Sequence, residues 1–236
     1  MFLPSRLLLG AVVAFVAIGA AQRPLPAKAP VVVELFTSQG CSSCPPADAF
    51  MGTLAARPDL VALTRPVTYW DRLGWKDTLG RTANTQLQNG YAARQLRGAG
   101  VYTPQIVVQG GDAAVGSNRG GVAWLIDRAK PISTLDVVKD GGGRIVQLRG
   151  GSGGATEVKL VALKAQADVR IGRGENGGRT VRYHNVVLDE RVIGRWNGGA
   201  ARLAVPASAL RVRGADRYAV IVQRPGPGAI VAAHYL

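Results

Sequence analysis

The residues of this sequence best suited to chemistry are two cysteines three positions apart, Cys41 and Cys44. The chain has no other cysteine. Both lie between a continuous apolar run at residues 31–36 and a segment whose apolar residues recur at helical spacing. We therefore expect them at the start of a helix. This arrangement predicts thiol–disulfide exchange at Cys41 and Cys44.

A cysteine pair at a helix start favours redox chemistry because the thiolate is the reactive species. The free N–H groups and positive dipole end of the first turn stabilise negative charge at Cys41. The dipole contributes about 0.3–1 kcal/mol, so Ser42, Ser43 and the Cys44 thiol are expected to supply further hydrogen bonds. Cys41, which we expect to be exposed at the helix tip, would attack a partner disulfide, and Cys44 would then resolve the mixed disulfide.

Two other roles for the cysteines stay open from the sequence alone. A structural disulfide that closes so short a loop would contribute at most about 2 kcal/mol, against about 3 kcal/mol for a 15-residue loop. A metal site needs more ligands than one pair of thiolates, and the only two histidines, His184 and His234, lie far along the chain. We therefore predict no metal site and no cofactor.

The elements that position the cysteines follow from the spacing of apolar residues. Residues 31–36 are typical of a strand buried on both faces, apart from Glu34, whose carboxylate must be hydrogen-bonded or reach a polar site near the cysteines. The chain then predicts a helix up to residue 57, a strand at 61–70, a loop at 71–83, a helix at 84–96, a strand at 105–109, a hairpin into 113–116 and a helix from 118 to 130.

The predicted order from residue 31 to residue 131 is β-α-β-α-β-β-α, which is the order of a thioredoxin-like α/β fold. Beyond it, about seven short strands separated by turn signals predict an all-β, sandwich-like C-terminal subdomain. The predicted organisation is a signal peptide at 1–21, an N-terminal linker at 22–30, a thioredoxin-like domain at 31–131, a Gly-rich connection at 132–154 and the all-β subdomain at 155–236.

A second candidate site is the dipeptide Thr103-Pro104 at the head of the predicted third strand. A proline at the first position of a strand is common and often only structural. In a thioredoxin-like fold, however, this position lies beside the cysteine pair, and a cis peptide bond would leave the backbone of Thr103 free to pair with an extended substrate. We therefore expect a cis bond and a substrate-positioning role for Thr103 and Pro104.

The long loop after the predicted second strand carries aromatic and charged residues. Aromatic side chains in such loops often fill a local core. The alternative is that the loop covers the cysteines and shapes access to them. The candidates for shaping the site are Glu34, Ser42, Ser43, Trp70, Trp75 and Lys76.

The N-terminus predicts export. Arg6 precedes an apolar run at residues 7–18, and three small residues at 19–21 suit cleavage. An uncleaved anchor is the alternative, but the run is shorter than the roughly 18 residues of a membrane span. A periplasmic or secreted location would allow the cysteines to oxidise.

The chain is strongly basic, with a formal net charge of +14. Its arginines are dispersed singly and no recognition motif for nucleic acid is present, so we predict no nucleic-acid partner. The charge instead predicts weak attraction to an acidic envelope surface.

Four longer motifs surround the candidate residues. They are F-T-S-Q-G-C-S-S-C-P-P-A-D at 36–48, Y-W-D-x-L-G-W-K-D at 69–77, V-Y-T-P-Q at 101–105 and R-G-E-N-x-G-R-T at 173–180. Together they resemble a family of secreted bacterial thioredoxin-like proteins of unassigned function. The resemblance extends over nearly the whole mature chain. It implies a thioredoxin-like N-terminal part with an added β part, and it implies no particular substrate.

The sequence therefore predicts an exported thiol–disulfide oxidoreductase with Cys41 as nucleophile and Cys44 as resolving cysteine. Its partners would be protein or small-molecule thiols and disulfides, together with a redox partner protein. The alternative function is a non-catalytic envelope binding or assembly module. In that case the thioredoxin-like part is a scaffold and the β subdomain carries the function.

Overall fold

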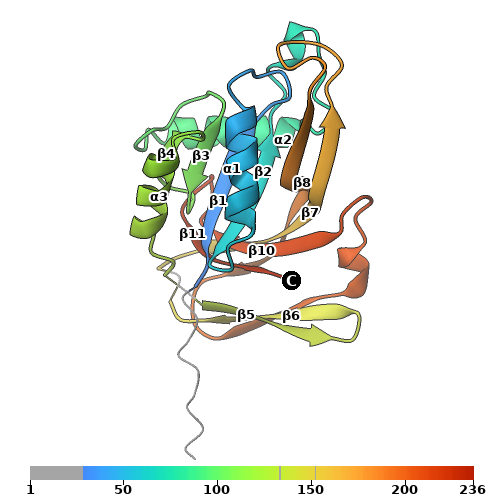
Figure 1. The fold of residues 1–236 in the computed structure, drawn as a ribbon. Helices are drawn as coiled ribbons and strands as arrows, with labels where there is room; N and C mark the ends of the chain where they lie inside the picture. Colours follow the sequence, from blue (N-terminus) through green and yellow to red (C-terminus); the bar gives the residue numbers. More distant parts are fainter. Residues whose placement is uncertain (1–28, 133, 152) are drawn as a thin grey trace, which may run out of the picture.

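The computed structural model describes residues 29–236 except residues 133 and 152 (Figure 1). The expected signal peptide and nearly all of the expected linker lie outside the described residues. Within the described part of the chain, no helix is long and apolar enough to cross a membrane. The described residues form a mixed α/β fold with one large sheet, a smaller sheet and three α-helices.

The elements of the N-terminal half follow one another in the predicted order. They are β1 (Val31–Thr37), α1 (Pro45–Ala55), β2 (Leu60–Pro66), the short 3₁₀ helix η1 (Asp71–Leu73), α2 (Thr82–Ala93), β3 (Gln105–Val108), β4 (Ala113–Val115) and α3 (Arg119–Arg128). The C-terminal half consists of β5 (Thr134–Asp140), β6 (Gly143–Arg149), β7 (Thr156–Arg170), β8 (Thr180–Trp196), β9 (Ala201–Val205), the 3₁₀ helix η2 (Ala207–Leu210), β10 (Arg217–Gln223) and β11 (Ile230–Tyr235).

Strand β1 lies inside the sheet and is buried along its whole length. It pairs in parallel with β2 and antiparallel with β3, which pairs antiparallel with β4. Val33 and Leu35 pack with α1 and α3, whereas Phe36 packs with Tyr91 of α2 on the other face. Because strand side chains alternate between faces, Thr37 lies on the α1 face. The carboxyl end of β1 therefore lies close to the start of α1.

The C-terminal strands extend this sheet and do not form the separate sandwich-like subdomain expected from the sequence. The strand order is β11-β10-β7-β8-β2-β1-β3-β4, and β8 joins β2 in parallel through Thr64 and Val186. Four of the short strands that we expected merge into the two long strands β7 and β8, which pair antiparallel. The physical reason is that β2 would otherwise leave an unpaired edge, which β8 covers.

A smaller sheet of order β5-β6-β9 packs on the outer part of the large sheet. Leu135, Val146 and Leu148 share a core with Leu160 and Val220. Sheet-on-sheet packing is therefore present locally, between the smaller sheet and strands that also belong to the large sheet. The β5–β6 hairpin lies inside the stretch that we expected to be a Gly-rich connection. Glycines of that stretch form the hairpin turn and do not form a linker.

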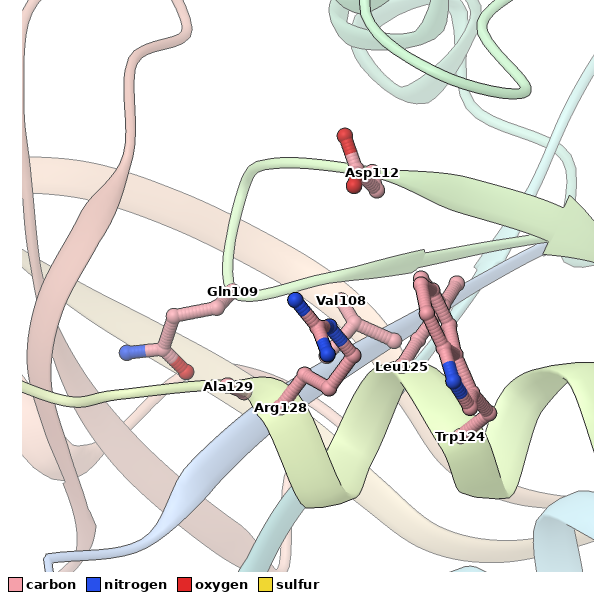
Figure 2. A pocket seen from close by; sticks show the side chains of 7 residues that line it. All are labelled: Val108, Gln109, Asp112, Trp124, Leu125, Arg128 and Ala129. Carbon is pink, nitrogen blue, oxygen red and sulfur yellow. The ribbon is translucent and has the colours of Figure 1, made fainter.

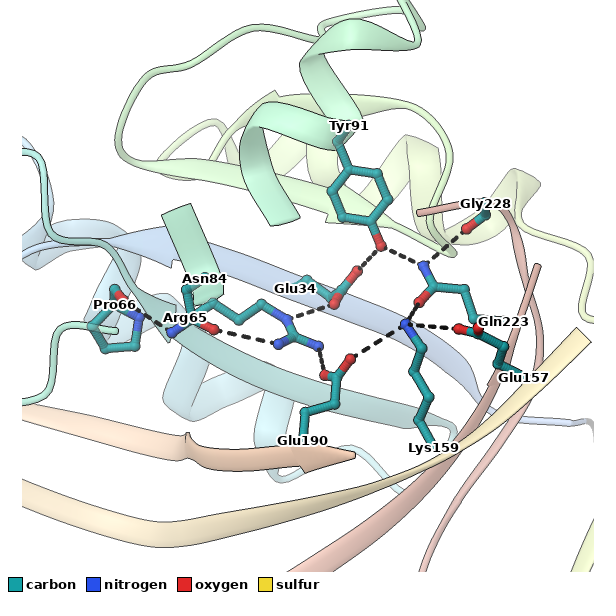
Figure 3. Close-up of polar contacts among 10 residues, drawn as sticks. All are labelled: Glu34, Arg65, Pro66, Asn84, Tyr91, Glu157, Lys159, Glu190, Gln223 and Gly228. Atoms are coloured by element: carbon teal, nitrogen blue, oxygen red, sulfur yellow. Dashed lines mark hydrogen bonds and ion pairs between the residues drawn. The ribbon is translucent and has the colours of Figure 1, made fainter. Parts of the chain in front are cut away.

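A buried polar network joins the two halves of the large sheet (Figure 3). Arg65 of β2 donates through Nε to Glu34 of β1 and through a terminal nitrogen to Glu190 of β8, each at 2.6 Å. The Tyr91 hydroxyl donates to Glu34 at 2.6 Å, and Lys159 of β7 lies 3.5 Å from Glu190. Burial alone would raise the pKa of Glu190, but Arg65 and Lys159 hold it below its usual range.

The same network answers the question that the sequence raised about Glu34. This carboxylate is fully hydrogen-bonded inside the sheet. It lies on the α2 face of β1, opposite the face that carries α1. The structure therefore does not bring Glu34 to the cysteines.

Candidate functional site

A short loop carries both cysteines from the end of β1 to α1. Cys44 directly precedes the helix, and prolines occupy its first two positions, where a missing N–H costs no helical hydrogen bond. Cys41 and Cys44 form a disulfide with Cα atoms 5.4 Å apart. The Ser43 hydroxyl lies 3.3 Å from Cys41 Sγ. The structure thus places an oxidised cysteine pair at the helix start, where the sequence predicted it.

The exposure expected for Cys41 is wrong, because Cys41 and Cys44 are both 0% exposed. Their neighbours Ser42 and Ser43 are exposed, so the disulfide lies directly beneath the surface. Two segments from elsewhere in the chain contact the cysteine loop: the loop between β2 and α2, and the β7–β8 turn at residues 171–179. Both lie with the cysteine loop at the upper end of the sheet in Figure 1.

The loop between β2 and α2 is tied to the cysteine loop through Gln39. The Gln39 N–H donates to Asp77 Oδ2 at 2.8 Å. The Gln39 side-chain oxygen accepts from Trp75 Nε1 at 2.8 Å and from the Thr78 N–H at 3.2 Å. Burial raises the pKa of Asp77, although the hydrogen bond from Gln39 lowers it. Trp75 is therefore packed in place and also borders the cysteine loop. The loop between β2 and α2 thus both fills a local core and covers the cysteine loop, as the two interpretations of the sequence proposed.

Trp70 links the same loop to Thr103-Pro104. Its Nε1 donates to Thr103 Oγ1 at 2.8 Å, and the Thr103-Pro104 bond is cis, as expected. A Cβ added at Gly116 would lie 3.2 Å from Pro104 Cβ and 3.1 Å from Ala47 Cβ, an approach that glycine permits. Gly116 therefore lies between Pro104 and Ala47 in the first turn of α1, which places the cis-proline across Gly116 from the helix that begins after Cys44.

The β7–β8 turn contributes two residues that the sequence analysis did not assign to the site. Buried Asn176 donates through Nδ2 to the carbonyls of Gln39 and Cys41, at 3.0 and 2.8 Å. Glu175 Oε2 accepts from the Ser42 N–H at 3.0 Å, and hydrogen bonding from Ser42 holds the pKa of Glu175 below its usual range. The R-G-E-N-x-G-R-T motif was their only signal, and it gave no position in the fold.

Asp48, in the first turn of α1, is a third residue that the sequence analysis missed. Its N–H donates to the Cys44 carbonyl at 3.0 Å, and side chains four residues apart share one helix face. Thr37 Oγ1 donates to Asp48 Oδ1 at 2.7 Å, whereas Oδ2 is buried with no hydrogen-bond partner among the described residues. Burial raises the pKa of Asp48 to about 8, against a lowering by Thr37 and with a further rise from Asp77. The spacing of four from Cys44 was the available signal.

The remaining predicted site residue, Lys76, is exposed and makes no hydrogen bond or ion pair in the described part of the chain. The structure does not bring it to the disulfide. Within residues 29–236, leaving aside 133 and 152, no group of three His, Cys, Asp or Glu side chains could hold a metal ion. The site therefore consists of the disulfide, the cis-proline turn, two tryptophans, Asp48 and the β7–β8 turn.

A pocket of about 190 Å³ near the opposite end of β1 is separate from this site (Figure 2). It lies between the β3–β4 turn and α3, where the Arg128 guanidinium lies 4.8 Å from the Trp124 ring centroid. Val108 in its wall pairs with Val33 of β1, whereas the cysteines follow the opposite end of β1. Trp124 and Arg128 therefore take no part in the cysteine site.

The chain matches one protein family and is similar to solved structures. The family model described as DUF1223, a protein of unknown function, matches residues 32–223. The crystal structure of a protein from Agrobacterium tumefaciens shares 30% identity and a TM-score of 0.77, covering 89% of this chain and 94% of that one. HBP35 of Porphyromonas gingivalis has a TM-score of 0.57 over 89% of this chain and 75% of its own, and at 13% identity it shows similarity of fold alone. No curated protein matches the chain.

Proposed function

The chain belongs to the DUF1223 family of proteins of unknown function, and we propose that it is an exported thiol–disulfide oxidoreductase. The observation that carries this proposal is the Cys41–Cys44 disulfide at the start of α1, with the cis Thr103-Pro104 bond across Gly116 from the same helix. The strand order β2-β1-β3-β4, with α1 and α3 on one face and α2 on the other, supports a thioredoxin-like arrangement of this half.

In the reduced protein, Cys41 is the nucleophile. The Ser43 hydroxyl, 3.3 Å from Cys41 Sγ, and the positive dipole end of α1 favour its thiolate, whereas Pro45 and Pro46 offer no N–H group to it. The thiolate attacks one sulfur of a substrate disulfide, forms a Cys41–substrate disulfide and releases the other substrate sulfur as a thiolate. This step leaves one half of the substrate covalently attached to Cys41.

Cys44 completes the exchange. Its thiol loses a proton, and the resulting thiolate attacks Cys41 Sγ, restores the Cys41–Cys44 disulfide and releases the second substrate thiol. Asp48 is placed to take that proton, because it shares a helix face with Cys44 and its pKa of about 8 is close to that of a thiol. Two electrons pass from the cysteine pair to the substrate, and a thiol partner then reduces the pair. The reverse sequence oxidises a dithiol.

Access to the buried disulfide requires a covering segment to move. The β7–β8 turn is that segment in our proposal, because Glu175 and Asn176 make three hydrogen bonds to the backbone around Cys41. Its glycine-rich sequence suits a turn that changes conformation. Once it opens, an extended substrate backbone pairs with Thr103 beside the cis-proline, and the turn then closes again over the bound segment.

The proposed setting is the periplasm or the exterior of the cell, because the first 21 residues suit an export signal. The proposed substrates are protein or small-molecule disulfides and thiols. The basic surface would add weak attraction to acidic envelope surfaces. Such a compartment lets the pair cycle between disulfide and dithiol.

Reduction of insulin disulfides by dithiothreitol tests the proposal. The purified protein is expected to accelerate the reaction, followed as the turbidity of the released insulin chain. Cys41→Ser should remove the acceleration completely, because a serine hydroxyl does not supply a thiolate. Ser208→Ala, at an exposed position of η2 beside the smaller sheet, is the control and should retain it. The proposal fails if the unaltered protein is no faster than Cys41→Ser.

The complete burial of both cysteines also fits a second function, a non-catalytic envelope binding or assembly module with a purely structural disulfide. In that case Cys41→Ser/Cys44→Ser would retain function in cells. Deleting the C-terminal residues 141–236 would not test this second function separately. The deletion removes β7, β8, β10 and β11, which belong to the main sheet, and would therefore disrupt the fold that carries the cysteines.

A further inference from the structure

A pocket of about 380 Å³ opens beside the cysteine loop. Three segments line it: the cysteine loop, the loop between β2 and α2, and the β7–β8 turn. The lining residues are Gly40, Trp70, Leu73, Trp75, Gly174 and Glu175. Gly40 directly precedes Cys41. A side chain bound in this pocket would therefore belong to a residue close to the reacting cysteine of the substrate.

The walls of the pocket are aromatic and fixed in position. Trp70 Nε1 donates to Thr103 and Trp75 Nε1 donates to Gln39, each at 2.8 Å, so both indole N–H groups are satisfied within the protein. A Cβ added at Gly172 would lie 2.7 Å from the Trp75 ring, which shows how closely that ring packs against the β7–β8 turn. The indole rings are thus held ready to pack against a ligand.

Glu175 is the one charged side chain that lines the pocket. One of its oxygens accepts from the Ser42 N–H. Among the described residues, no lysine or arginine forms an ion pair with Glu175, although the chain has 29 Lys and Arg against 15 Asp and Glu. Its negative charge is therefore available to a ligand, at a point where the rest of the protein is strongly basic.

We propose that this pocket binds a lysine or arginine side chain next to the reacting cysteine of a substrate protein, an inference that rests on the proposed function. The aliphatic stem would pack on Trp70 and Trp75, and the cationic head would pair with Glu175. An arginine would also stack on an indole face. A leucine offers no charge to Glu175, and an acidic side chain is repelled by it. The substrate class is therefore a peptide segment with a basic residue beside its cysteine.

Three peptide probes test this inference on the Cys44→Ser protein, in which Cys41 is the only thiol. Each blocked tripeptide carries Arg, Leu or Glu before a cysteine that is disulfide-bonded to 5-thio-2-nitrobenzoate. Cys41 attacks the peptide sulfur and releases the coloured thiolate, which gives a second-order rate constant. We expect the Arg probe to react about tenfold faster than the Glu probe and about threefold faster than the Leu probe.

Glu175→Gln should reduce the ratio of the Arg rate to the Glu rate to about one or below, because only the basic background remains. The readout is a ratio because this substitution also changes the reactivity of Cys41 toward all three probes alike. Asp140→Asn, in the smaller sheet, removes the same charge far from the pocket and should leave the ratio unchanged.

Equal rates for the three probes, a fastest rate for Leu or Glu, or a ratio unaffected by Glu175→Gln would overturn the inference and leave the redox function standing. If no probe reacts with Cys41, the proposed function fails as well.

Discussion

Replacing Asp48 with asparagine is expected to slow the resolution of a Cys41 mixed disulfide about 100-fold. Cys44 attacks only after it loses its proton, and Asp48 offers a buried carboxyl on the same helix face with Oδ2 unpartnered among the described residues. Asparagine keeps the shape and the acceptor for Thr37 but takes up no proton. A single-turnover reaction of the reduced protein with a peptide disulfide, quenched by acid and analysed by mass spectrometry, gives the resolution rate.

The pH dependence of the same step separates a chemical role from a structural one. With Asp48 present, the resolution rate should rise through an ionisation at about pH 8, where its carboxyl titrates. Asp48→Asn should lose this ionisation. The control is Asp127→Asn, the same change at an exposed position of α3, which should leave rate and profile intact. Resolution by Asp48→Asn at the unaltered rate would show that Asp48 is not the proton acceptor.

Asp48→Asn should also be more stable than the unaltered protein at alkaline pH. Folding raises the pKa of Asp48 from 3.8 to about 8, so the folded state keeps a proton that the unfolded chain loses between these values. Asp48 therefore lowers stability as pH rises from about 4, and the loss is complete above about pH 8. Asp48→Asn should raise the free energy of unfolding by roughly 3–5 kcal/mol at pH 8 and leave it nearly unchanged at pH 4. Urea unfolding of the oxidised protein at both pH values measures this.

Arg65→Met is expected to lower the free energy of unfolding by about 3–5 kcal/mol. The side chains of Arg65 and Glu34 are 2% and 1% exposed, and the second partner, Glu190, is 18% exposed. Removing the guanidinium leaves the buried Glu34 carboxylate without a cation and leaves Glu190 with Lys159 alone, inside the network that joins the two halves of the sheet. Urea unfolding at neutral pH gives the difference.

Arg57→Met is the matched control for Arg65→Met. Arg57 also pairs with a carboxylate, that of Asp59 at 2.7 Å, but the two side chains are 40% and 50% exposed. Because solvent screens an exposed pair, its loss should cost less than about 1 kcal/mol. Equal losses for the two variants would contradict the role assigned to the buried network.

The local part of the site was predictable from the sequence. The apolar run of β1, the prolines after Cys44 and the helical spacing beyond them fixed the cysteines at a helix start, because each signal acts over a few residues. Thr103-Pro104 could be singled out in the same way, since a proline at a strand head has a restricted set of roles. Asp48 could also have been predicted, from its spacing of four residues from Cys44.

The long-range part of the site was not predictable. Thr64 pairs with Val186, and Asn176 reaches the Cys41 carbonyl, across sequence separations that no periodicity encodes. The sequence shows that residues near 156–196 form strands, but it does not show whether those strands make their own sheet or complete another. The burial of Cys41 and the roles of Glu175 and Asn176 all depend on that choice.

The most direct measurement of the central claim is mixed-disulfide trapping by the folded Cys44→Ser protein. After reduction and exposure to glutathione disulfide, intact mass and peptide mapping should show one glutathione per chain, attached to Cys41, because serine at position 44 cannot release it. Cys41→Ser, which retains only Cys44, should form much less adduct. If Cys41 stays unmodified in the folded protein and reacts only after denaturation, the pair is structural and the oxidoreductase account is contradicted.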